Sequence, residues 1–288
     1  LGFLLLPKRL YNNNLVDKYS QSKFKNIYNI ILLCKTILII YIGSFLVQRI
    51  NYDMFSVFYF IIGTTITAVS ISKIKSNNVI ELSTWFVIVA IIIYMLAFFH
   101  MVDFDFSKLN IFNFSAPNLY FYLIILSIFS DNLLVLLTDK SNLKINKWTI
   151  VLPIITQALF VMLELYQMLF AAGDKLFLDY EFIGFVSLSF QTTSNYVGNL
   201  NFVYLFIITM ATIINTSFNL SVIRQSYSVK KTILIDILFI VTIIASLIFI
   251  NRLDFNLVVN ILLYISSIGV ILLFWYIKEV YNARKIKG

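Results

Sequence analysis

The sequence has few charged residues, one cysteine and one histidine, and each shortage argues against a class of protein. Only 12% of its 288 residues are charged, 60% are hydrophobic, and the mean hydropathy is +0.89. A soluble domain of this length needs more polar surface to present to water. We therefore expect a polytopic membrane protein, in which lipid surrounds the apolar residues.

The single cysteine and the single histidine leave no basis for disulfide, zinc or Ser-His-Asp chemistry. Cys34 has no second cysteine with which to form an intramolecular bridge, and it lies in an apolar run where a small core residue is expected. His100 ends an apolar run, where we expect an interfacial position rather than a metal-ligand role. The sequence thus predicts a protein without a cofactor, a metal site or enzymatic activity.

Eight apolar segments are long enough to cross a bilayer, with about 19–24 residues each. Helices are expected, because a membrane barrel strand would alternate in polarity and be half as long. An amphipathic run at about 180–190 is predicted to lie on the membrane surface. Together they form one transmembrane domain over residues 1–288. The predicted spans are Ile27–Gln48, Met54–Ser72, Ile80–Met101, Asn118–Leu137, Trp148–Ala171, Phe202–Ile223, Lys230–Ile250 and Asn256–Ile277.

The first residues are also unlike a complete membrane segment. Leu1–Leu6 is too short to cross about 30 Å of hydrocarbon, and Lys8 and Arg9 follow at once. A signal peptide would carry its charges before the apolar run. We therefore expect this sequence to be the N-terminally truncated part of a longer protein.

The distribution of cations predicts the orientation in the membrane. Of the 22 lysines and arginines, seventeen lie in alternate connections between predicted spans, Arg224 among them, and four lie in the opposite connections. This asymmetry places residues 7–26 and the C-terminus in the cytoplasm. It also accounts for the net charge of +8 without a nucleic-acid partner.

One cation and one acid fall inside predicted spans at similar depth. Lys35 lies about 12 Å, and Asp131 about 9 Å, from the predicted cytoplasmic ends of their spans. A charge at such a depth costs roughly 3 kcal/mol or more. The two side chains could relieve this cost by pairing. The alternatives are a Lys35 side chain that reaches the interface and a structural hydrogen bond for Asp131.

The predicted span Phe202–Ile223 carries polar residues at the same level. Their offsets of three, four and seven residues place them on one helical face. The stripe serves either as a hydrogen-bonding contact between helices or as the wall of a ligand site. Its members are Thr212, Asn215, Thr216 and Asn219.

Two further polar features lie in other predicted spans. Ser130, Asp131 and Asn132 are three poor helix formers in a row. In transporters, broken helices expose backbone groups to a substrate at mid-membrane. Glu164 lies nearer the external side, where it either titrates a proton or faces an outer vestibule.

The order of these features resembles that of the spore-germination permeases, the B-type subunits of nutrient germinant receptors. These proteins belong to the amino acid–polyamine–organocation superfamily. Three departures from the family are Ser130-Asp131 for Gly-Glu, Glu181 for Pro, and Asn199-Leu200-Asn201 for Arg-Leu-Asp. The matching segments are Tyr11–Lys25 before IYNIILL, the loop Arg49–Asp53, the acidic loop Met101–Phe112, and FSDNLLVLLTDK at Phe129–Lys140.

The resemblance implies an inverted five-plus-five helical repeat, of which this sequence lacks the first helix and most of the second. It implies a substrate site at the bilayer midplane. Glu164, from its place in its own span, is the candidate proton-coupling residue. The substrate-binding residues would be Lys35, Ser127, Ser130, Asp131, Asn132, Thr212, Asn215, Thr216 and Asn219.

The resemblance further implies a function in nutrient sensing. The protein would be a permease-like subunit that binds an amino acid and triggers germination, in the bacterial cytoplasmic membrane or the spore inner membrane. Its partners would be membrane lipid and the A-type and C-type receptor subunits. An ion-coupled amino acid transporter is the alternative within the superfamily. A lipid-modifying enzyme or flippase would need an interfacial polar cluster, for which the sequence offers only His100, Asp103 and Asp105.

Overall fold

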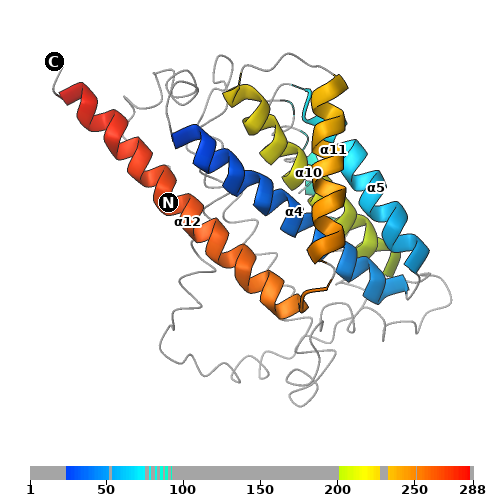
Figure 1. Cartoon of the computed structure of the whole chain (residues 1–288). Coiled ribbons are helices and arrows are strands. Elements are labelled where there is room, and N and C mark those ends of the chain that lie inside the picture. Colours follow the sequence, from blue (N-terminus) through cyan, green and yellow to red (C-terminus); the bar gives the residue numbers. More distant parts are fainter. Residues whose placement is uncertain are drawn as a thin grey trace. The chain divides into compact units, whose positions relative to one another are not determined.

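The computed structural model describes residues 24–51, 54–74, 201–227, 233–250 and 252–285, with isolated helical positions between 78 and 92. These residues are helical apart from short turns, which confirms the all-α class for this part of the chain (Figure 1). The helices are α4 (Phe24–Asn51), α5 (Met54–Ile71), α10 (Asn201–Ser226), α11 (Ile233–Ile250) and α12 (Phe255–Lys285).

The helices coincide with predicted spans, but several of their ends differ. α4 begins three residues earlier than expected, and α12 continues eight residues further, to Lys285. α10 ends at Ser226 rather than at Ile223, so Arg224 lies in its last turn. Counting Arg224 as a loop cation was therefore wrong. The other predicted spans and the surface helix at 180–190 fall on residues outside the described ranges or on isolated positions.

Three of the described helices are long and apolar enough to cross a membrane. Their apolar parts are Phe24–Gln48, Leu205–Ser226 and Phe255–Tyr276. α5 and α11 hold 18 residues each, or about 27 Å of helix at 1.5 Å per residue. These lengths and compositions support the membrane class that the hydropathy predicts.

The chain divides into two compact units. The first contains α4, α5, α11, α12 and the part of α10 from Ala211 onward. The second contains α10 up to Met210 and the described positions from 82 to 92. Within the second unit, the rings of Phe86 and Phe206 lie 6.4 Å apart. The polar sites described below lie in the first unit.

α4 packs against both α12 and α5 in the first unit, and α11 packs against α5 and α4 (Figure 1). The aromatic contacts show that α4 and α12 are antiparallel. Phe24 stacks on Tyr276 at one end, with ring centroids 5.1 Å apart. Phe45 stacks on Phe255 at the other end, at 4.3 Å. α4 is consequently anchored by aromatic contacts near both of its ends.

The polar helix ends of the first unit lie together. The Tyr227 hydroxyl, just after α10, donates to the Asn26 side-chain oxygen at the start of α4, at 3.2 Å. Phe24 and Tyr276 bring the C-terminal third of α12 to the start of α4. All of these ends are predicted to be cytoplasmic from the cation pattern. The helix directions agree with the predicted alternation of cation-rich and cation-poor connections. That the cation-rich side is cytoplasmic stays a prediction.

Candidate functional site

Small polar residues recur at the same interval on α4 and α10, and the two helices approach closely at two of these positions. Each helix contributes three buried residues at intervals of seven, and because seven residues make nearly two turns, each set lies on one face of its helix. We call these six residues the polar seam. Its members are Asn29, Thr36 and Gly43 on α4, and Thr212, Asn219 and Ser226 on α10.

Two contacts fix the register of the polar seam. At one end, the Asn29 side-chain amide donates to the Ser226 hydroxyl at 2.6 Å. At the other end, Gly43 lies so close to α10 that an added Cβ would be 2.6 Å from the Thr212 Oγ1. These contacts are fourteen residues apart on both helices, so the antiparallel register is constant between them. The middle residues of the two sets therefore lie at the same level.

The middle of the polar seam contains a buried amide donor with no partner. Asn219 is 2% exposed, and its Nδ2 has no hydrogen-bond partner. Thr36, at the same level, donates its own hydroxyl to the Leu32 carbonyl at 2.8 Å. An unsatisfied buried polar group costs about 1–3 kcal/mol, so a bound acceptor at this position would gain a favourable contact.

Lys35 brings a buried cation to the same level of the helix pair. Its side chain is 4% exposed. The register of the seam places Lys35 level with Leu220, about 1.5 Å along the axis from Asn219. Since successive helical residues are about 100° apart, Lys35 flanks the seam instead of lying in it. The register thus places Lys35 level with the Asn219 end of the predicted polar stripe on α10, and the depth of both residues in the membrane stays a prediction.

The four predicted polar residues of α10 differ in burial. Thr212, Thr216 and Asn219 are buried, whereas Asn215 is exposed. The Thr216 hydroxyl donates to the Thr212 carbonyl at 2.6 Å and so serves its own helix. The substrate-binding role of these four residues stays a prediction. Asn219 is the member whose buried side-chain Nδ2 has no hydrogen-bond partner.

The other predicted site residues lie outside the described residues. This applies to the suggested pairing of Lys35 with Asp131, and to the possible break in the helix around Asp131. Cys34 is half-buried in α4. The residues outside the described ranges are Ser127, Ser130, Asp131, Asn132, Glu164 and His100.

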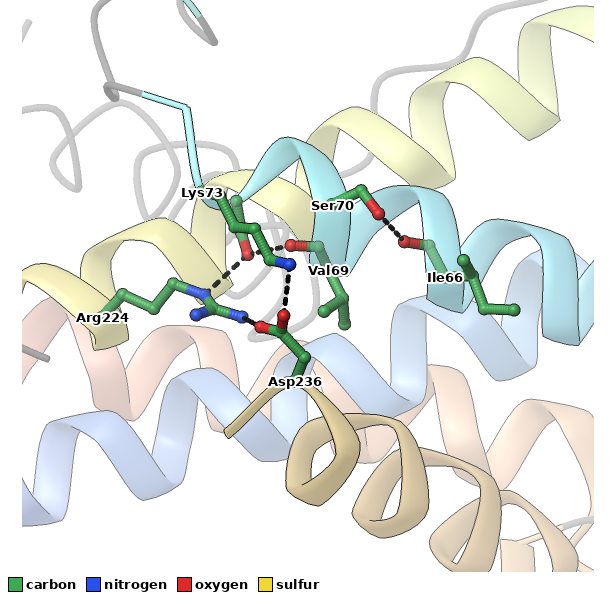
Figure 2. A network of polar contacts seen from close by, with 7 residues as sticks. Ile66, Val69, Ser70, Lys73, Arg224 and Asp236 are labelled. Carbon is green, nitrogen blue, oxygen red and sulfur yellow. Dashed lines mark hydrogen bonds and ion pairs between the residues drawn. The ribbon is translucent and has the colours of Figure 1, made fainter. Parts of the chain in front are cut away.

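A charged cluster, missed from the sequence, joins α5, α10 and α11 (Figure 2). Lys73 and Arg224 each form an ion pair with Asp236, on different carboxylate oxygens. The Arg224 Nε donates to the Ser72 hydroxyl at 2.9 Å, and that hydroxyl donates to the Val69 carbonyl at 2.6 Å. We call Ser72, Lys73, Arg224 and Asp236 the charged cluster.

Each member of the charged cluster lies at the end of a helix. Lys73 lies in the turn after α5, where its backbone N–H donates to the Ser70 carbonyl at 3.2 Å. Arg224 is in the last turn of α10, and Asp236 is in the first turn of α11. A cation near a helix C-terminus and an anion near an N-terminus both complement the helix dipole. Local helix electrostatics therefore favour these charges where the three helices meet.

The burial of Arg224 makes the charged cluster energetically important. Its side chain is 6% exposed, and its guanidinium lies over the Phe239 ring, 5.1 Å from the centroid. Its Nη1 is buried without a hydrogen-bond partner. Two cations share one carboxylate, which leaves a net charge of +1. Removing one partner of a buried pair costs more than the pair itself contributes, because a charge is left uncompensated.

No protein-family model, curated protein or solved structure matches this chain. Among the described residues, no group of three or more His, Cys, Asp or Glu side chains is placed to hold a metal ion.

Proposed function

We propose that this chain is the permease-like subunit of a spore germinant receptor and binds an amino acid at the level of the polar seam. The order of sequence features supports the assignment to that family and to its inverted five-plus-five repeat. The binding role rests on one observation: the Asn219 Nδ2, midway along the polar seam, is buried and has no hydrogen-bond partner.

The chemistry at this level suits a carboxylate. An ionised carboxylate only accepts hydrogen bonds, and the Asn219 Nδ2 only donates them. Lys35 supplies a buried positive charge at the same level of α4. In a low-dielectric interior, such a cation and such a donor attract a bound carboxylate more strongly than they would in water. In this proposal Asp131 supplies the negative charge that pairs with the ligand's ammonium group.

Binding would act by shifting a conformational equilibrium. A ligand that fits one arrangement of the helices better than another favours that arrangement. In the superfamily's repeat, this is a rocking of one bundle against the other around a midplane site. The A-type and C-type receptor subunits would detect the change. The proposed topology places the charged cluster and the C-terminus on the cytoplasmic side.

Replacing Asn219 tests the proposal. We expect Asn219→Leu in the full-length protein to weaken amino acid binding at least tenfold, about 1.4 kcal/mol, because a donor to the ligand is lost. Binding of each common amino acid to protein in nanodiscs is measured by scintillation proximity. Asn256→Leu is the matched control, since Asn256 is an exposed asparagine at the start of α12.

Unchanged affinity in a correctly inserted Asn219→Leu variant would contradict the site. Binding of no amino acid by the unsubstituted protein would contradict the substrate class. Uptake into vesicles driven by an ion gradient would instead favour the ion-coupled transporter, which has the same proposed fold.

A further inference from the structure

Beside the start of α11, the part of the chain that the structure describes places two cations and one acid. In the charged cluster, Lys73 and Arg224 share the single carboxylate of Asp236. Lys230 and Lys231 precede the first residue of α11 by three and two positions. The positive end of the α11 dipole adds to them. An anion at this end would therefore meet the cations Lys73 and Arg224 and, among the described residues, one acid.

Beside this charge, α11 exposes an apolar face. The residues on it are 55–76% exposed, whereas Phe239 and Ile243 on the opposite side of the helix are buried. Lys73 is 34% exposed, so its side chain is accessible from outside the bundle. The apolar face begins at the cationic end and continues along the helix. It comprises Ile233, Leu234, Ile237, Leu238 and Val241.

We propose that this face binds an anionic phospholipid, with its phosphate near Lys73 and the start of α11. Its acyl chains lie along the exposed apolar side of α11. The headgroup compensates the excess of positive charge, and the chains cover the apolar surface. A soluble anion would satisfy the charge but leave the apolar face uncovered. The proposal requires membrane insertion and is independent of the proposed nutrient site.

The test compares two phospholipids with the same acyl chains, phosphatidylglycerol and phosphatidylcholine. The full-length protein is equilibrated with an equal mixture, and retained lipids are counted by native mass spectrometry. We expect a preference for phosphatidylglycerol that falls about fivefold in Lys73→Gln, as expected for one cation near a membrane surface. Lys278→Gln is the matched control, because Lys278 is an exposed lysine of α12, outside the charged cluster.

A second variant keeps the test decisive if Lys73→Gln does not fold. Lys73→Met, which keeps the length of the side chain without its charge, is expected to lower the preference as much. Millimolar glycerol phosphate should not displace the retained lipid, and displacement would show a free-anion site instead. An equal loss in Lys278→Gln, or no loss in the folded test variants, would overturn the proposal and assign these cations to general surface charge.

Discussion

Replacing Asp236 with leucine is expected to destabilise the protein by about 3–5 kcal/mol. The substitution removes the carboxylate that Lys73 and Arg224 share. Lys73 is 34% exposed and is able to turn toward water. Arg224 is 6% exposed and has no such alternative, so it would remain as a buried cation without a counter-charge. The unfolding free energy in detergent, measured with increasing denaturant, gives the loss directly.

Replacing the arginine of the ion pair, instead of the aspartate, is expected to lower the unfolding free energy by less. Arg224→Met leaves Asp236 paired with Lys73 through its other oxygen, so no buried charge is left uncompensated. The double variant Asp236→Leu, Arg224→Met should be more stable than Asp236→Leu alone, because it removes both buried charges. A larger loss for Arg224→Met than for Asp236→Leu, or strictly additive losses in the double variant, would contradict this account of the charged cluster.

The helical class was predictable because, in lipid, a chain has few ways to form hydrogen bonds with all of its backbone N–H and C=O groups. Apolar runs of about twenty residues must form helices there, and the described helices lie where such runs occur. The ends were harder to predict. Hydropathy falls at Arg224, so the predicted span stopped at Ile223, but α10 continues to Ser226, with Arg224 paired to Asp236 in its last turn.

The charged cluster could have been predicted by extending the depth argument made for Lys35. Asp236 lies six residues after Lys230, inside a predicted span, and Arg224 lies one residue beyond the preceding span. Both are thus near the same side of the membrane. Counting Arg224 among the topology-setting cations treated it as solvated, which concealed its partner.

The polar seam was only partly predictable. Its intervals of seven residues are visible in the sequence, but nothing there indicates that α4 lies against α10. Asn29 and Ser226, which are hydrogen-bonded, are 197 residues apart. Helical periodicity also places Asn215 and Asn219 on one face, and it does not indicate which of them is buried. That difference arises from the neighbouring helices, which only the structure identifies.

Among the described glycines, Gly43 is the one at which an added methyl group should destabilise the protein most. A Cβ there would lie 2.6 Å from the Thr212 Oγ1 and 3.0 Å from the Phe60 ring. These neighbours belong to α10 and α5, so the glycine permits close approach of α4 to both helices. We expect Gly43→Ala to destabilise by about 1–3 kcal/mol and Gly43→Val by more, because the packed neighbours must move.

Two other glycines provide controls for the Gly43 series. A Cβ at Gly63 meets no atom within 4 Å, and one at Gly269 meets Ile31 at an ordinary 3.4 Å. Alanine at either site is expected to be neutral or to stabilise by about 0.5–1 kcal/mol. Denaturant unfolding in one detergent compares the variants. If Gly43→Ala proved as stable as Gly63→Ala, the register of the polar seam would be wrong. The shared level of Lys35 and Asn219, which rests on that register, would then no longer hold.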